Sequence, residues 1–511
     1  MVGVNFCFNS GFKEIAQLGW QELFMTFKTW SLALALASSA LLTACGGSST
    51  STNTNVRLLN ATSDCASLTM NVNGAAIASS SSIAKGAVAS AYNSLGTSLV
   101  NLTFSCTQNG TTTTYYSNPS FSVSGTAGPY TLVIAGSSTN PSLFFLNENA
   151  ATPAAGTFNV RVLDTASSAG VLSVYLVSAS NTGSTNDLTS APLVFSDVTS
   201  STFNNGYSNS TVPSGNAYEL VVTGSNKVPG VSNDVRLDIP NLPIADKSNL
   251  TLILSSGASG NLVSGYVLNQ QGTMVATSST TGLARIRVAN GMAVTSNTIT
   301  SATSSFSTTN TLPKFVSASN TLLASTPVTP TAAAIGSYVT VPTDSTDATS
   351  ITVRMGSSSF AVPATVLTPG QDYTLLVYGN SAYSLVPDNN LLPTQTSVAS
   401  NFVNVRLYNA VSSATGTLSV TSINQPVGSP ISAAYGNSSG SVTLPNNPFF
   451  TCNAAGSNMT LYATGLGSAS SATANGLTTF PGYLYSVFVT GNAASPNVQV
   501  LTDYPTATTC Q

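Results

Sequence analysis

Histidine is absent from this chain of 511 residues, and charged residues make up only 6% of it. Without an imidazole, a Ser-His-Asp triad has no group that can take the proton from the nucleophile. The 13 Lys and Arg residues, set against 16 Asp and Glu, form no basic patch that could neutralise a run of phosphates. We therefore expect no nucleic-acid partner, and a surface solvated mainly by hydroxyl and amide groups.

Clusters of Cys and His with zinc-ligand spacing are missing as well, and no glycine-rich phosphate loop precedes a helix. Two short stretches do match catalytic motifs: GNSSG at 436–440 fits G-x-S-x-G, and SIAK at 82–85 fits S-x-x-K. The first lacks a histidine and a strand-to-helix context, and the second lacks its companion motifs S-D-N and K-T-G. We interpret them as a turn and a solvated loop, and we expect neither catalysis nor a cofactor.

Carboxylates leave one catalytic alternative open, because a glycan-active enzyme needs only two of them flanking the scissile bond. The tightest groupings are Asp344 with Asp347 in TDSTD, and Asp234 with Asp238 in DVRLD. Either pair could bind calcium, but we favour a solvated turn or strand face and expect no metal site. Two acids converging within about 5 to 9.5 Å in a cleft would favour the enzyme.

The residues from Trp30 to Ala44 are almost all apolar or small. This run is shorter than the roughly 20 residues of a membrane-spanning helix, but it matches the core of a signal peptide, with Lys28 ahead of it. The following LTAC, residues 42–45, resembles the lipobox of bacterial lipoproteins. The resemblance implies that residues 1–44 are removed, that Cys45 is lipidated, and that residues 45–54 form a tether to the membrane.

Residues 1–24 carry Glu14, Glu22 and Cys7, which are unusual ahead of a signal peptide, so we expect Met25 to be the true start. In the lipoprotein family an aspartate after the cysteine marks retention in the inner membrane. Here Gly46 stands at that position, which implies anchoring in the outer membrane, on either its periplasmic or its exposed face.

The rest of the chain repeats itself four times. Each repeat opens with an arginine-bearing motif: NVRLLNA (Arg57), NVRVLDT (Arg161), RIRVANG (Arg287) and NVRLYNA (Arg406). Each closes with a β-rich motif ending in glycine: YTLVIAG, LTLILSSG, YTLLVYG and YSVFVTG. A tyrosine near a turn lies between them in every repeat: Tyr92, Tyr207, Tyr338 and Tyr435. A period of about 100 to 130 residues indicates whole domains.

Alternating apolar residues and frequent turn signals predict several short strands per repeat and no helix, which is typical of a β-sandwich. The three motifs resemble those of the domain-of-unknown-function 4397 family, over residues 53 to 505. That resemblance implies an all-β chain of four tandem immunoglobulin-like β-sandwich domains. We name them unit one (55–149), unit two (157–272), unit three (282–390) and unit four (402–511), and expect each to fold separately.

Four cysteines, Cys65, Cys106, Cys452 and Cys510, remain in the exported part. An even number in an oxidising compartment predicts two disulfides, with three possible connectivities. We favour Cys65 with Cys106 and Cys452 with Cys510, because each pair then lies within one unit. Each would contribute about 4 kcal/mol in the chain-entropy treatment.

The four arginines recur at one position of the opening motif, which favours a structural role: the aliphatic stem packs and the guanidinium meets backbone carbonyls or a carboxylate. The sequence thus predicts a lipid-anchored envelope protein with a structural or adhesive role, which binds a protein or glycan through loops at the sandwich ends. The alternative is a carboxylate-dependent glycan-active enzyme or a glycan-binding module.

Overall fold

The chain is described here from a computed structural model. The described residues are 54–504, apart from 96–98, 123–127, 139, 179–192, 200–202, 204–205, 211–216, 226, 230–233, 258, 277–281, 293–298, 307–314, 318, 324–334, 344–347, 356, 366, 391–401, 413–416, 423–430, 446–456, 465–471 and 480–483. Secondary structure in them consists of strands and two short 3-10 turns, η1 (Ala78–Ser80) and η2 (Ser167–Ala169). The predicted all-β class is confirmed.

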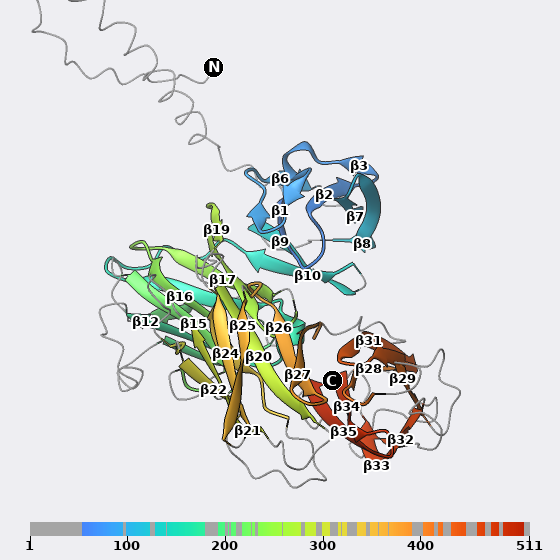
Figure 1. The fold of residues 1–511 in the computed structure, drawn as a ribbon. Helices are drawn as coiled ribbons and strands as arrows, with labels where there is room; N and C mark the ends of the chain where they lie inside the picture. Colours follow the sequence, from blue (N-terminus) through green and yellow to red (C-terminus); the bar gives the residue numbers. More distant parts are fainter. Residues whose placement is uncertain are drawn as a thin grey trace, which may run out of the picture. The chain divides into compact units, whose positions relative to one another are not determined.

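Unit one contains two sheets, each described here in its order of pairing (Figure 1, blue to cyan). The first is β10 (Asn140–Asn147), β9 (Pro129–Ser137), β1 (Thr54–Thr62) and β5 (Ala87–Val88), with β6 (Asn93–Leu95) also on β1. The second is β3 (Ala75–Ala76), β2 (Ser67–Val72), β7 (Val100–Gln108) and β8 (Thr111–Phe121), with β4 (Ile83–Ala84) also on β2.

Unit two repeats the arrangement. Its first sheet is β14 (Ser208–Ser210), β11 (Phe158–Asp164), β17 (Asn249–Ser256), β18 (Val263–Asn269) and β19 (Met274–Ala276). Its second sheet is β13 (Leu193–Val198), β12 (Leu172–Ser178), β15 (Ala217–Gly224) and β16 (Val235–Pro243).

Units three and four follow the same plan with four strands in each sheet. In unit three these are β23 (Val339–Thr343), β20 (Gly282–Gly291), β26 (Asp372–Tyr378) and β27 (Ala382–Asp388), and then β22 (Ser319–Leu323), β21 (Ile299–Phe306), β24 (Thr349–Met355) and β25 (Ser358–Thr365). In unit four (red in Figure 1) they are β31 (Asn437–Pro445), β28 (Phe402–Asn409), β34 (Leu484–Asn492) and β35 (Ser495–Tyr504), and then β30 (Ile431–Ala434), β29 (Thr417–Ser422), β32 (Ser457–Thr464) and β33 (Ala472–Thr479).

The strand that carries the opening motif, hereafter the opener strand, pairs in parallel with the strand of the closing motif in every unit: β1 with β9, β11 with β17, β20 with β26 and β28 with β34. The sheet that contains this pair is named the opener sheet, and its companion the second sheet. Because the two strands are far apart in sequence, this pairing closes each unit across its whole length.

The core of each of the first three units is made from its own residues. In unit one, Val56 and Leu58 of the opener strand meet Leu68 and Phe104 of the second sheet, and comparable clusters fill units two and three. Alternate residues of a strand point to opposite faces, so these clusters use one face of each sheet. Separate folding of the units stays a prediction.

The other face of the opener sheets is also buried, against a neighbouring unit. Leu59 and Val133 of unit one pack with Leu163 and Ile253 of unit two. Leu376 of unit three likewise packs with Tyr408 and Phe488 of unit four. Residues Thr54–Gln511 accordingly form one compact unit. No helix within the described part of the chain is long and apolar enough to cross a membrane.

Candidate functional site

All four repeat arginines are buried, with 1 to 2% of each residue exposed. Each stands opposite a hydroxyl residue of the closing strand: Arg57 opposite Thr131, Arg161 opposite Thr251, Arg287 opposite Thr374, and Arg406 opposite Ser486. In the first three units the arginine Nε donates to the threonine Oγ1 over 2.8 to 2.9 Å, and Arg406 donates from Nη2 to Ser486 over 3.1 Å. The parallel register thus fixes each guanidinium against the closing strand.

These hydroxyl residues were missed by sequence reasoning, although a signal was present. The second position of every closing motif is Thr or Ser, within a run that is otherwise almost wholly apolar. A small hydroxyl recurring at one position among large apolar residues indicates a buried polar partner, since such a group is costly to bury without a hydrogen bond.

The arginine side chains point away from the core of their own unit. Val56 and Leu58 belong to the core of unit one, whereas Leu59 and Ala61, on the same face as Arg57, belong to the cluster shared with unit two. The arginines therefore lie in the contacts between sandwiches, which we call joints.

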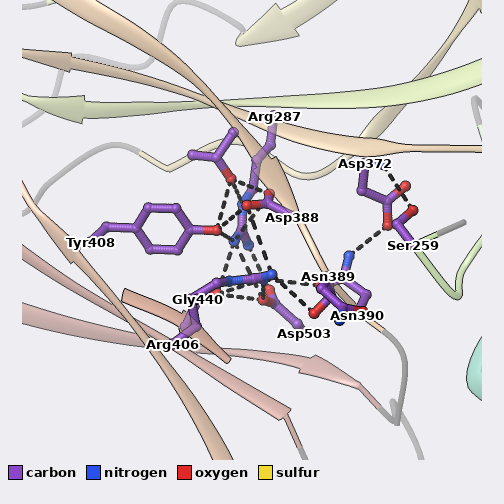
Figure 2. A network of polar contacts seen from close by, with 12 residues as sticks. Ser259, Arg287, Asp372, Asp388, Asn389, Asn390, Arg406, Tyr408, Gly440 and Asp503 are labelled. Carbon is purple, nitrogen blue, oxygen red and sulfur yellow. Dashed lines mark hydrogen bonds and ion pairs between the residues drawn. The ribbon is translucent and has the colours of Figure 1, made fainter. Parts of the chain in front are cut away.

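At the joint of units three and four, two arginines and two aspartates form one network (Figure 2). Arg287 donates to Asp503 Oδ1 over 2.5 Å, and Arg406 donates to Asp503 Oδ2 over 2.7 Å. Asp388 lies 4.0 Å from Arg287 and 3.7 Å from Arg406. Asp388 accepts hydrogen bonds from Thr374 and Tyr338 of unit three and from Tyr408 of unit four. Each acid is thus held by groups from both units.

Burial and charge act in opposite directions on this network. The side chains of Asp388 and Asp503 are 0% and 3% exposed. Burial by itself raises the pKa of Asp503, but Arg287, Arg406 and the hydroxyl of Ser486 outweigh it and hold that pKa below its usual range. Burial also raises the pKa of the Tyr408 phenol, so it stays protonated and donates. The joint therefore buries a charge-balanced cluster, as buried ions require.

The joint of units one and two is built differently around Arg57. Its Nη2 donates to both oxygens of Glu148 over 2.9 and 3.0 Å, and its Nη1 donates to the carbonyl of Gly272 in unit two over 2.6 Å. The backbone N–H of Gln271 donates to Glu148 over 3.0 Å. Here one acid of unit one receives donors from both units.

Unit two differs from the others at the place of this acid. Glu148 of unit one and Gln270 of unit two occupy equivalent positions. The backbone N–H of each donates to the carbonyl of the residue just before the closing motif, Pro129 in unit one and Asn249 in unit two. Asp388 pairs with Asp372 at the corresponding register in unit three. Gln270 therefore replaces the acid, and its amide instead exchanges two hydrogen bonds with the backbone of Ala150, of 2.8 and 3.0 Å.

Asn390, at the end of unit three, connects three units (Figure 2). Its backbone N–H donates to Ser259 O of unit two over 2.7 Å, and its Nδ2 donates to Asp372 Oδ2 of unit three over 2.5 Å. Arg406 of unit four donates to its Oδ1 over 2.9 Å. The same Asp372 oxygen accepts from Asn261 of unit two over 3.1 Å. Asn390 is fully buried, and its backbone N–H bonds unit two while its side chain bonds Arg406 of unit four and Asp372, which unit two also bonds.

Three of the four repeat tyrosines stack on the arginine of their own unit. The guanidinium carbon lies 4.9 Å from the ring centroid of Tyr92, 4.3 Å from Tyr207 and 4.4 Å from Tyr338. Each of these tyrosines directly precedes a strand that pairs with the opener strand. This cation–π contact offsets part of the cost of burying the guanidinium.

Tyr435 does not follow this pattern. The residue opposite Arg406 on the neighbouring strand is Ser441, six residues later. Tyr435 instead packs edge-on against Tyr378 of unit three, with ring centroids 4.8 Å apart. The turn after it needs Gly436, because φ is +76° there and a Cβ would lie 2.3 Å from the Tyr378 ring. Sequence position alone could not separate this tyrosine from the other three.

Cys65 and Cys106 form a disulfide, with Cα atoms 5.8 Å apart, as the preferred pairing predicts. It links the start of the second sheet of unit one to β7 inside the core. Cys45, Cys452 and Cys510 lie outside the described residues, so lipidation and the second disulfide stay predictions.

The other motifs lie in ordinary β structure. GNSSG forms a turn and the start of β31, and Ser82 and Lys85 are exposed beside the two-residue strand β4. Asp234 pairs with Arg236 over 2.6 Å and lies 3.9 Å from Arg285 of unit three, while Asp238 accepts from the backbone N–H of Phe315 over 3.2 Å. Asp344 and Asp347 lie outside the described residues. Among those that are described, no three Cys, Asp or Glu residues gather as a metal site would require.

Comparison with known proteins gives a family match over part of the chain and likenesses to solved structures. No curated protein sequence matches the chain. Among solved structures, the chain is similar to a candidate cell adhesion protein from Bacteroides ovatus, with 10% identity and a TM-score of 0.18, over 46% of this chain and 96% of that one. A likeness at this TM-score supports neither fold nor function. Residues 54–175, which comprise unit one and the first strands of unit two, match the model of the family "Domain of unknown function (DUF4397)".

Proposed function

We propose that this protein is a non-catalytic spacer and binding protein of the cell envelope, anchored by lipid on Cys45 to the outer membrane. The observation that carries the proposal is the burial of the repeat arginines in joints between sandwiches. At the joint of units three and four, guanidiniums and carboxylates from both units neutralise each other. At the joint of units one and two, the Arg57–Glu148 pair of unit one is bonded by backbone groups of unit two. Buried ion pairs of the described residues thus lie where the domains meet.

A spacer benefits from such joints because a buried ion pair is directional. Apolar contacts alone let two sheets slide, whereas the Arg287–Asp503 pair and the hydrogen bond from Arg57 Nη1 to the carbonyl of Gly272 are satisfied in one orientation. Stiff joints would keep the distal units, and the partner they bind, at a constant distance from the lipid anchor. The partner is an unidentified protein or glycan.

In the alternative function, a glycan-active enzyme, two carboxylates would act together, and Asp388 and Asp503 are two acids that lie in one network in Figure 2. Both are almost completely buried and both face arginines. A glycosidase needs one carboxylic acid and one carboxylate that reach the sugar. The burial and the lowered pKa of Asp503 support a structural use for this pair.

The anchoring is tested in cells that express the natural sequence or its Cys45→Ser variant. Labelled fatty acid should enter the natural protein and not the variant, and the variant should leave the membrane fraction. Stable anchoring needs two or more acyl chains, and Cys45 is the residue that would carry them. If the Cys45→Ser variant loses membrane binding only in part, a second anchor must be present. Equal labelling of both proteins would contradict the proposal. Protease treatment of intact cells would then assign the exposed or the periplasmic face.

A further inference from the structure

The second sheet of unit one has an outward face composed of short polar side chains in rows. β2, β7 and β8 align Ser67 with Thr107 and Thr112, and Thr69 with Ser105 and Thr114. A third row aligns Asn71 with Thr103 and Ser117. The intervening residues, such as Leu68 and Phe104, point into the core. We call these nine residues the hydroxyl face of unit one; none of them is buried.

Unit three presents the same pattern on its second sheet. Thr303 stands between Thr321 and Thr352, and Ser305 stands between Ser319 and Ser350. The residues between them, including Ala302, Ile351 and Val353, belong to the core. These six side chains form the hydroxyl face of unit three, and they too are at least partly exposed.

The geometry of the sheet sets the spacing of the rows, except that a bulge in β8 places Thr114 and Ser117 of successive rows three residues apart. Neighbouring strands lie about 4.8 Å apart, and alternate residues of a strand about 6.7 Å apart. Some of the groups are also oriented by one another: the hydroxyls of Thr107 and Thr112 are 2.9 Å apart, and Asn71 donates to Ser105 over 3.0 Å. The face therefore presents hydrogen-bond donors and acceptors in successive rows.

The chemistry of these faces selects the class of partner. No row on either face contains a charged residue. An ionic ligand would find no counter-charge within these rows; the exposed Arg354, two residues after Thr352 on β24, lies just outside the hydroxyl face of unit three. A protein partner requires an apolar or aromatic centre in the interface, and the rows contain none. A partner that is itself uncharged and rich in hydroxyl groups fits.

An exposed sheet face that offers only single surface hydrogen bonds favours a polymer over a small sugar. Each exposed hydrogen bond replaces a bond to water and adds little net free energy. Useful affinity therefore needs many such bonds at once, along several rows and on two units of the chain. An extended polysaccharide or an ordered polysaccharide surface can supply them, and a monosaccharide cannot.

We propose that the hydroxyl faces of units one and three bind a neutral, extended polysaccharide. The inference rests on the proposed binding role, and it names both the class of partner and the surface, which differs from the loops at the sandwich ends.

The test is co-sedimentation of the full mature chain, kept soluble by Cys45→Ser, with particles of cellulose, chitin and insoluble mannan; heparin beads provide a charged comparison. The protein should sediment with at least one neutral polysaccharide and not with heparin, and glucose, N-acetylglucosamine and mannose should not compete. The variant Ser105→Lys with Thr303→Lys places one charge at the centre of each face and should lower the bound fraction at least fivefold.

The matched control is Thr113→Lys. Thr113 is exposed on the same strand as Thr114, but it pairs with Cys106 and so belongs to the opposite side of the sheet. This variant should bind within twofold of the parent. If Ser105→Lys disturbs folding, as judged by circular dichroism and the Cys65–Cys106 bond, Thr114→Lys on the edge strand replaces it.

Two results would overturn the inference. The parent protein could stay in the supernatant with all three neutral polysaccharides. Alternatively, the charged variant could sediment as well as the parent, which would move binding to other surfaces, such as the loops, and would leave the proposed binding function intact.

Discussion

Arg287 of unit three donates a hydrogen bond of 2.5 Å to Asp503 of unit four, across 216 positions of sequence. Arg406, the equivalent arginine of unit four, donates to the same carboxylate over 2.7 Å. Asp503 thus holds two buried cations that belong to different domains, and the integrity of the joint depends on its charge.

Asp503→Asn should loosen the joint of units three and four. Removing one member of a buried ion pair leaves its partner uncompensated and costs about 3 to 5 kcal/mol. The exposed residues Ser357 of unit three and Asn437 of unit four can be replaced by cysteine and labelled with distance probes. The distribution of distances between the two labels should be broader in Asp503→Asn than in the parent. Thr502→Ala, an exposed neighbour on the same strand, serves as the control; an unchanged distribution in Asp503→Asn would show that the network does not hold the joint.

The same carboxylate gives the joint a dependence on acid. The pKa of Asp503 is lower in the folded chain than in the unfolded one. Its stabilising contribution is therefore present above the unfolded pKa of about 3.8 and is lost as the pH falls through the lower, folded value. The parent should keep its narrow distribution from neutral pH down to about pH 4 and broaden only below that, and Asp503→Asn should lack this acid-dependent step.

Asn390→Ala should loosen both joints of unit three, because this side chain links Asp372, which unit two also binds, to Arg406 of unit four. Asn390→Asp keeps the acceptor for Arg406 but loses the donor to Asp372, so it should affect chiefly the joint with unit two. Distances from Ser357→Cys to Lys247→Cys and to Asn437→Cys separate the two effects.

The control for Asn390 is its neighbour Asn389. The Asn389 residue is exposed, and the contact it makes with Arg406 is through its carbonyl, which survives substitution by alanine. Equal broadening in Asn389→Ala and Asn390→Ala would mean that the segment, and not the Asn390 side chain, couples the joints.

Asp164→Asn should stabilise unit two above neutral pH. In all four units the sixth residue of the opening motif accepts a hydrogen bond from the backbone N–H two positions later. The residue is asparagine in three units and Asp164 in unit two. Burial raises the pKa of Asp164 to about 7, because an ionised carboxylate loses solvation there.

The sign follows from the raised pKa. The contribution of Asp164 to stability is fully present below its unfolded pKa of about 3.8 and is lost as the pH rises through about 7. At about 1.4 kcal/mol per pKa unit, the loss is at most a few kcal/mol. Thermal unfolding should therefore show Asp164→Asn to be more stable than the parent at pH 8 and not at pH 4; an equal gain at both values would contradict the assignment. Asn60→Asp should create the same dependence in unit one.

Peptide mapping without reduction should find Cys452 linked to Cys510, in addition to the Cys65–Cys106 bond of the structure. Each of the two bonds would then lie within a single unit, because each unit closes on itself through the pairing of its opener and closing strands. A bond from Cys452 or Cys510 to a cysteine of unit one would contradict the boundaries of the units.

Much of the fold could be predicted from the sequence because strands leave a local pattern. The alternation around Arg57 and the apolar closing motif mark the two strands that pair, and the spacing of Cys65 and Cys106 within one repeat identified the disulfide. The buried hydroxyls of Thr131 and Ser486 were also readable, since a lone Thr or Ser recurs within an apolar run.

The sequence by itself determined the class of fold, the four repeated openings and the burial of polar groups at fixed positions, because these follow from the period-2 geometry of strands. Only the tertiary structure decided which face of the opener sheet each arginine occupies, that Asp503 meets Arg287, that Asn390 joins three units, and that Tyr435 turns to Tyr378. The physical reason is that both faces of the opener sheets are buried. The alternation of apolar and polar residues along a strand then no longer distinguishes a core-facing residue from a residue on the other face. The partner of each buried charge depends on which domain packs against that face, and the local sequence does not contain this information.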